Sequence, residues 1–356
     1  MGIGAGFLEA LGGEAGCRRL SEEFYARVGK DPILRPLFPG KSLRCAIEEF
    51  AAFLIQFLGG DEEQTQYRWW LSLRESHARF QIGERERGAW LKRMGEAQEA
   101  VGLDGETREA LRKFFVQSSA YVAGKDSSTL QNEELSARWA EQRVVDDTVE
   151  LIAAGREQEA LALAPRIAAR PSVYVGLLAR MMQTGRTEFI GYVMDAIRRE
   201  PTLADRRFAG RTILHFAAGA GCIEVVALLL SLGTNPEVAD RGGHTPLYRV
   251  SNECGSETGP EVVRALVQAG GDVNACSGVT RTTALHMAAR RGFVGIASAL
   301  IECGAEFEAE DSKGITPLLR AIRCRKDSVA RLLVERGARV PAKPATPRTA
   351  RTRRST

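Results

Sequence analysis

The chain has 356 residues, of which 44% are hydrophobic and 26% charged, a composition typical of a globular protein with two or three domains. No apolar run approaches the ~18 residues of a membrane helix, and the longest, residues 51–58, is interrupted by Gln56, so we expect no membrane partner. The net charge of +4 arises in residues 341–356, which alone carry +5, so the rest of the chain gives no reason to expect a nucleic-acid partner.

The cysteines exclude two further classes of site. Seven of them are scattered along the chain without a Cys-x-x-Cys pair, which argues against a disulfide framework and against a zinc site. The first residues, Met1 to Gly6, lack the basic region of a secretory signal peptide and the Ser or Thr of a myristoylation site. We therefore expect a cytoplasmic protein.

Aromatic residues are concentrated in the first third of the chain. Nine of the fourteen phenylalanines and three of the four tryptophans lie before residue 126. The hydrophobic pattern of this region predicts helices at about residues 17–29, 42–58, 84–101 and 106–122. The second helix has an unusually aromatic apolar face, whose members recur at steps of three and four residues: Leu43, Ala46, Ile47, Phe50, Phe53, Leu54 and Phe57.

A polar break at residues 124–128, Gly-Lys-Asp-Ser-Ser, separates this region from Ala-, Leu- and Val-rich helical patterns. The end of the chain, rich in Pro and Arg and without acidic residues, cannot form a packed core and is predicted to be disordered. The predicted parts are a first domain at 1–125, a helical connector at 126–170, a repeat domain at 171–340 with clear repeats over 206–340 and a degenerate capping repeat at 171–205, and a disordered basic tail at 341–356.

The repeats are visible as a recurring four-residue motif. It begins at Thr212, Thr245, Thr283 and Thr316, and the intervals are 33, 38 and 33 residues. A second amphipathic helix and a glycine follow each motif. A period of about 33 residues with this content resembles ankyrin repeats, which implies an all-α solenoid that binds other proteins.

The motif positions have physical roles. The Thr caps the first helix of the repeat, Pro suits its first turn, and the late Gly takes a left-handed turn. His215 and His286 occupy the fourth position and are expected to be structural hydrogen-bonders, while Tyr248 and Leu319 replace them in the other repeats. About four extra residues in the second repeat, near 252–258, are expected to enlarge the turn between its helices.

A solitary histidine lies in the aromatic region. His77 is the only histidine before His215, and it lies within the segment Leu73-Arg74-Glu75-Ser76-His77-Ala78-Arg79-Phe80-Gln81-Ile82. A lone histidine on an apolar face is more often a satisfied core residue than a ligand. One imidazole in aromatic and aliphatic surroundings is also what a haem iron requires of a protein.

Neighbouring motifs favour the haem interpretation. In this order, over about residues 7–123, the chain resembles group II truncated haemoglobins at six elements: Gly12-Gly13, Phe24-Tyr25, Phe38-Pro39, Phe53-Leu-x-Gln-x-x-Gly-Gly60, the segment from Leu73 to Ile82, and Trp90-Leu-x-x-Met94. The resemblance implies an all-α fold in which a two-over-two helical globin domain at 1–125 precedes the ankyrin solenoid. It also implies haem b with its iron, held non-covalently.

The resemblance assigns roles to particular residues. His77 would bind the iron, and Tyr25 and Trp90 would donate hydrogen bonds to a diatomic ligand. Ala46 stands where many globins place a distal His or Gln, and it can neither donate nor ligate. The remaining residues would surround the haem, with Arg74 near its carboxylates: Phe38, Phe50, Phe53, Leu54, Leu73, Arg74, Phe80 and Ile82.

Two departures from the family pattern concern the surroundings of the haem. The family's Arg-Gly-His-Pro stretch reads Arg68-Trp69-Trp70-Leu71 here, and we expect the two tryptophans to be packing or interface residues. Glu49 replaces a basic residue common on the distal helix, which changes the contacts available to the haem carboxylates. Neither departure involves iron ligation.

The expected function is reversible binding of O2, and of NO or CO, by a haem domain joined to a protein-binding ankyrin domain whose partner is unknown. Such a protein would act as a gas sensor or as a localised oxygen carrier, and not as an enzyme. Two alternatives stay open. The haem could catalyse NO dioxygenation or peroxidase-like chemistry with an external reductant, or the protein could be a haem-free ankyrin adaptor.

Overall fold

The computed structural model describes residues 6–38, 40, 42–60, 72–77, 80, 82–124 and 132–340, without the side chains of Arg74 and Glu75. Within these ranges the chain is helical, with isolated β-bridges and no strand, so the predicted all-α class is confirmed. None of the helices in these ranges is both long enough and apolar enough to span a bilayer. The chain divides into two compact units, residues 1–213 and 214–356. The predicted basic tail and the pair Trp69-Trp70 lie outside the described residues.

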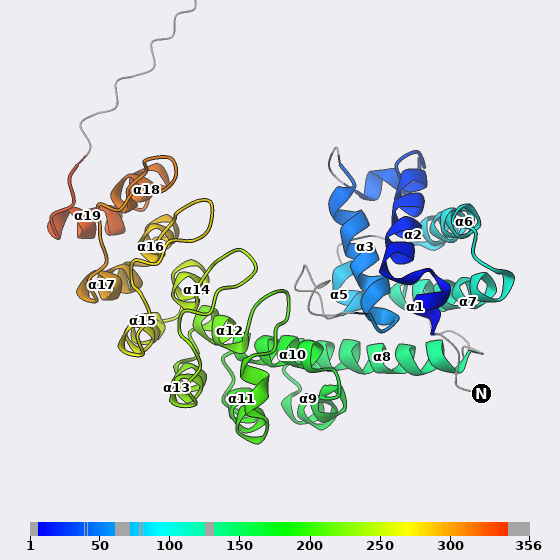
Figure 1. Cartoon of the computed structure of the whole chain (residues 1–356), viewed down its shortest axis with the longest axis horizontal. Helices are drawn as coiled ribbons and strands as arrows, with labels where there is room; N and C mark the ends of the chain where they lie inside the picture. The colour runs from blue at the N-terminus through cyan, green and yellow to red at the C-terminus, as the bar shows by residue number, and fades with distance from the viewer. Residues whose placement is uncertain are drawn as a thin grey trace, which may run out of the picture. The chain divides into compact units, whose positions relative to one another are not determined.

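The first part of unit one contains the four helices predicted from the sequence, here α2, α3, α6 and α7 (Figure 1). Helices α2 and α3 pack on each other, as do α6 and α7, and α2 also contacts α6. This is the two-over-two arrangement that the resemblance to truncated haemoglobins implies. The bounds are α1 Phe7–Ala10, α2 Gly13–Val28, η1 Arg35–Leu37, α3 Arg44–Phe57, α5 Leu73–His77, α6 Glu84–Ala100 and α7 Gly105–Val122.

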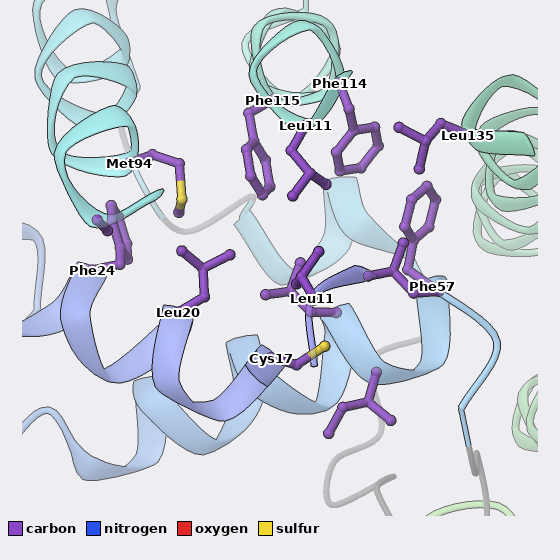
Figure 2. Packing of buried hydrophobic residues seen from close by; sticks show 14 of the residues in the cluster. Leu11, Cys17, Leu20, Phe24, Phe57, Met94, Leu111, Phe114, Phe115 and Leu135 are labelled. Atoms are coloured by element: carbon purple, nitrogen blue, oxygen red, sulfur yellow. The ribbon is translucent and has the colours of Figure 1, made fainter. Parts of the chain in front are cut away.

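One aromatic-rich hydrophobic core lies between these helices (Figure 2). Phe57 of α3 stacks on Phe114 of α7 with ring centroids 4.5 Å apart, and Phe114 lies 5.2 Å from Phe115. Fully burying an aromatic side chain of this size contributes about 2 to 3 kcal/mol. The concentration of phenylalanine in the first third of the sequence therefore corresponds to one packed core.

Helix α8, Glu133–Ala154, continues this core beyond the aromatic region. Asn132 caps its start by accepting the Leu135 backbone N–H at 3.0 Å, and Gly155 ends it in a left-handed conformation, φ 71°. Leu135 points toward Phe114 and Phe57 (Figure 2), and the Trp139 ring meets Phe114 edge-on. The first half of the predicted connector thus belongs to the core of the first domain.

The remainder of unit one is a series of shorter helices. α8 contacts α9, η2 and α10, and α10 packs on α11. Tyr174 of α10 and Tyr192 of α11 join these two helices through hydroxyl groups 2.8 Å apart. The bounds are α9 Glu157–Leu163, η2 Ala164–Ile167, α10 Pro171–Gln183, α11 Thr187–Arg199 and η3 Pro201–Ala204.

From α12 onward the chain forms successive helix pairs, which lie side by side from green to red in Figure 1. Thr245 and Thr316 cap their helices as predicted, accepting backbone N–H bonds at 3.3 Å. The glycines after the second helices have φ values between 82° and 100°, the left-handed turn expected of them. The bounds are α12 Ile213–Ala220, α13 Ile223–Ser231, α14 Pro246–Glu253, α15 Gly259–Gln268, α16 Ala284–Arg291, α17 Val294–Glu302, α18 Pro317–Arg323 and α19 Asp327–Glu335.

The repeat histidines are buried hydrogen-bonders, as predicted. His215 Nε2 bonds the carbonyl of His244 at 3.0 Å, and His286 Nε2 bonds the carbonyl of Ile315 at 2.8 Å. Each carbonyl immediately precedes the capping threonine of the next repeat. Because an imidazole in this position satisfies a backbone carbonyl of its neighbour, it connects consecutive repeats.

Where the histidine is replaced, a buried ion pair is found. Arg249 donates to both Asp240, with Nε–Oδ2 at 3.0 Å, and Glu253 at 2.7 Å. Arg320 pairs with Asp311 at the corresponding place. Burial alone would raise the pKa of Asp240, but hydrogen bonds from His244 and Arg249 outweigh it and hold that pKa well below its usual value.

The second repeat has the enlarged turn that its extra residues predict. Residues 254–258 separate α14 from α15, and the Thr258 hydroxyl donates to the carbonyl of Gly221 in the preceding repeat at 2.6 Å. Gly221, with φ 73°, has no room for a side chain, because an added Cβ would lie 2.2 Å from the Ser256 hydroxyl. The extra residues therefore pack against the neighbouring turn.

Replacing Asp240 with Asn should lower the free energy of unfolding of the repeats by about 2 to 3 kcal/mol. The substitution removes one of the two carboxylates that pair with the buried Arg249 and leaves only Glu253. Hydrogen exchange of residues 214–340 in increasing urea measures this. The exposed Asp327→Asn, at the start of α19, is the control and should change stability by no more than about 0.5 kcal/mol. Equal effects of the two substitutions would contradict the role given to Asp240.

The same aspartate gives a pH dependence of known sign. A carboxyl whose pKa is lower in the folded than in the unfolded chain stabilises the fold at pH values above its unfolded pKa, here 3.8. This contribution is lost as the pH falls toward the pKa of the folded state. The stability difference between wild type and Asp240→Asn should therefore narrow below pH 4. A difference that stayed constant from pH 7 to pH 2 would refute this.

Candidate functional site

His77 is the last residue of the short helix α5, and its ring is held by that helix. The Nδ1 atom lies 2.8 Å from the carbonyl oxygen of Leu73, four residues earlier. A carbonyl can only accept a hydrogen bond, so Nδ1 carries a hydrogen, and in the neutral ring Nε2 then carries the lone pair. This is the tautomer that a histidine ligand uses when it binds a metal through Nε2.

Ser76 reinforces this tautomer. Its hydroxyl donates to the same Leu73 carbonyl at 2.8 Å and lies 2.8 Å from His77 Nδ1. Because its hydrogen is given to the carbonyl, the hydroxyl oxygen can accept a share of the Nδ1–H bond. Two acceptors thus fix the orientation of the imidazole about its own helix.

The two predicted donors on the distal side lie around the same pair of rings. Tyr25 of α2 contacts Phe24 and Phe50, with centroids 5.0 and 6.3 Å away. Trp90 of α6 contacts the same two rings at 5.2 and 6.4 Å. The packing of α2, α3 and α6 therefore brings Tyr25 and Trp90 to one apolar centre, although 65 positions separate them in the sequence.

Tyr25 retains its proton in this environment. Burial, and after it the nearby carboxylate of Glu49, raise the pKa of Tyr25 above its ordinary value of 10.0. The phenol is consequently neutral at physiological pH and able to donate a hydrogen bond. Glu49 thus acts electrostatically on the predicted distal donor.

A continuous series of aromatic rings joins the distal and proximal groups. Tyr25 meets Phe38 edge-on at 5.6 Å, Phe38 lies 5.8 Å from Phe80, and Phe80 lies 6.2 Å from the His77 ring. All four side chains are half-buried, whereas Phe24 beside them is fully buried. The predicted site residues therefore present partly exposed apolar surface around His77.

The remaining predicted residues differ in their placement. Phe50, Phe53, Leu73, Ile82 and Trp90 share the half-buried character, as does Ala46 on α3. Leu54 does not, because it is fully buried in the hydrophobic core. Arg74 belongs to α5, but its side chain lies outside the described residues.

Asp146 is a neighbour of the site that sequence reasoning did not find. Its Oδ1 atom accepts the backbone N–H of Leu73 at 3.0 Å, although the two residues are 73 positions apart. The signal in the sequence is an acidic residue on an apolar helix face, since Trp139, Gln142, Asp146 and Val149 follow steps of three and four. A buried acid on such a face needs a partner.

This set of residues fits a haem. A haem needs one strong protein ligand to iron, apolar walls for the macrocycle, and distal groups suited to a diatomic ligand. His77 provides the first, the half-buried phenylalanines the second, and protonated Tyr25 with Trp90 the third. Glu49 is the one acidic departure among them.

Comparison with known proteins agrees with both parts of the fold. Residues 6–122 match the bacterial-like globins. The chain is similar to Group 2 truncated hemoglobin YjbI of Bacillus subtilis (strain 168), with 39% identity over 103 residues, which cover 29% of this chain and 76% of that protein.

The later residues, 180–276 and 252–343, match ankyrin repeats. Putative E3 ubiquitin-protein ligase XBAT31 of Arabidopsis thaliana is 31% identical over 163 residues, 40% of this chain and 34% of that protein. Ankyrin repeat and SOCS box protein 16 of Homo sapiens is 32% identical over 148 residues, 39% of this chain and 32% of that protein. The chain thus spans about a third of each of these two relatives.

Fold and matches together define a two-part protein in which ankyrin repeats follow a globin domain. The chain belongs to the bacterial-like globin family, as a homologue of the group 2 truncated haemoglobins. Both resemblances stated from the sequence are confirmed.

The raised pKa of Tyr25 predicts a loss of stability in alkali. A raised folded pKa means that the phenol ionises first in the unfolded chain, so its contribution is lost as the pH rises above 10.0. Between pH 8 and 11 this group should lower the free energy of unfolding of the wild type by about 1.4 kcal/mol. Tyr25→Phe has no ionisable hydroxyl and should not show this loss. Urea unfolding at the two pH values measures it, and equal losses in both proteins would contradict the raised pKa of Tyr25.

Proposed function

We propose that the globin domain binds haem b non-covalently through His77, and that the protein binds O2, and also NO and CO, reversibly. The observation that carries the proposal is the bond from His77 Nδ1 to the Leu73 carbonyl, which leaves the lone pair on Nε2. Membership of the globin family supports the choice of cofactor.

A bound haem would supply an iron centre that binds a diatomic ligand. His77 would hold the iron through Nε2. Tyr25 and Trp90 would donate hydrogen bonds to the ligand, and the raised pKa of Tyr25 keeps its hydroxyl in the donating form. Ala46 has no polar side-chain atom, so it neither ligates iron nor obstructs ligand entry.

The ankyrin repeats supply the second half of the proposed function. Repeats of this type suggest a protein partner. We propose that partner binding places a gas-binding domain at a particular protein, as a sensor or as a localised oxygen carrier, and not as an enzyme. The scattered, unpaired cysteines suit the reducing cytoplasm, where we propose that the protein acts.

The visible spectrum of the full chain with added haemin tests the cofactor. Wild type should show a Soret band that shifts on reduction and again with CO, whereas His77→Ala should lose this ligand-specific signature. Tyr174→Phe, outside the globin match, is the control and should retain it. A wild-type protein that takes up no haem would refute the proposal and leave the haem-free adaptor.

Stopped-flow measurement of O2 dissociation tests the distal roles. Tyr25→Phe and Trp90→Phe each remove one donor and should each speed O2 dissociation about 10- to 100-fold, the effect of losing one hydrogen bond to a charged acceptor. Trp139→Phe is the matched control, since its indole lies in the core against Phe114 and Tyr121. Wild-type rates in the two distal variants would exclude these donors.

The same oxygenated protein distinguishes binding from catalysis. If the function is reversible binding, O2 leaves unchanged and repeated cycles of deoxygenation restore the starting spectrum. Multiple turnovers of NO to nitrate, or of a peroxide, when a reductant is supplied would assign NO dioxygenase or peroxidase-like activity instead.

A further inference from the structure

We propose that Asp146 of α8 is a positioning residue for His77, and that α8 thereby responds to the ligand state of the haem. The proposal rests on the haem function above and adds a residue from outside the globin match, which ends at residue 122. Helix α8, the first helix after the globin match, thereby helps to hold His77 in position.

The contacts form a short relay through one residue. Asp146 Oδ1 accepts the Leu73 backbone N–H at 3.0 Å, and the Leu73 carbonyl accepts from His77 Nδ1 at 2.8 Å. The peptide groups on both sides of Leu73 are therefore tied, one to α8 and the other to the imidazole. A change in the position of Asp146 must alter the position of the carbonyl that orients His77.

The carboxylate itself is held firmly. Asp146 is 1% exposed, and Gln142, one turn earlier on α8, donates its Nε2 to the same Oδ1 at 2.8 Å. Trp139, a further step along this face, is packed against Phe114 in the globin core. The acceptor that caps α5 is thus fixed to the same core as the distal helices.

Helix α5 depends on this bond more than an ordinary helix would. Its five residues, Leu73–His77, are far too few for a helix that is stable on its own. A carboxylate that accepts the first backbone N–H stabilises such a turn as an N-cap does, and the bond is strengthened by the charge. α5 also contacts α7 and α8, so packing and the cap hold it together.

Helix α8 also connects the neighbourhood of His77 to other helices of unit one. Its 22 residues span about 33 Å. The helix contacts α9, η2 and α10, all within unit one. If the binding of a diatomic ligand moves His77, the free energy of that movement is shared with α8, and by linkage the state of α8 alters ligand affinity.

Two substitutions at Asp146 test the positioning role in the full-length haem protein. Asp146→Ala removes the acceptor and should speed haem loss to an apoprotein acceptor roughly fivefold, the size expected for one lost cap. It should also shift the iron–histidine stretching band in the resonance Raman spectrum of the ferrous form. Asp146→Asn keeps an acceptor oxygen and should restore both values most of the way to wild type.

Asp147→Ala is the matched control, because it changes the next residue of the same helix without touching the bond to Leu73. It should leave haem loss and the Raman band unchanged. Asp146→Ala with a wild-type band, or with the same haem loss as Asp147→Ala, would overturn the proposal.

A second measurement uses the wild type alone and does not depend on how the variants fold. Hydrogen exchange of the α8 segment 142–152 should differ at least twofold between the ferrous deoxy and CO-bound proteins, while α19, Asp327–Glu335, should not change. Equal exchange of α8 in a protein that binds haem and CO would refute the response of α8 and leave the haem function intact. A chain that binds no haem would refute the function itself.

Discussion

The hydrogen bond between His77 Nδ1 and the Leu73 carbonyl is the interaction on which the proposed haem site depends. It selects the imidazole tautomer, sets the ring plane, and leaves the lone pair of Nε2 for the proposed iron. The bond lies within a five-residue helix that cannot form alone, so the surrounding packing must supply its stability. Asp146 supplies part of it from α8, and contacts with α7 supply more.

The distal side follows a different principle. There the polar groups are few and lie among phenylalanine rings, so burial decides their protonation state. Tyr25 stays neutral in these surroundings, and the carboxylate of Glu49 acts in the same direction. Glu49 therefore favours retention of the donor proton on Tyr25. The proximal side relies on directed hydrogen bonds, and the distal side on an apolar environment.

The two parts of the chain differ in how far the sequence predicts them. The ankyrin repeats are built from local signals, which predict their threonine caps and late glycines from the sequence. The extra residues of the second repeat likewise predict the enlarged turn after α14. In the globin part, periodicity predicted the four long helices, and motif order singled out His77. The bond between Asp146 and Leu73 was not predicted, because it joins residues 73 positions apart and depends on how α8 packs. The buried ion pair of Asp240 and Arg249 was missed as well, since neither residue departs from an ordinary surface pattern in the sequence.

The central claim is that His77 is the protein ligand of a haem iron. Replacing His77 with Gly and then adding imidazole to the ferrous protein tests it most directly, because the free imidazole can occupy the place of the missing ring. The account predicts that the wild-type spectrum and CO response are lost in the variant and return as imidazole is added. A His77→Gly protein with an unaltered ferrous spectrum in the absence of imidazole would contradict it.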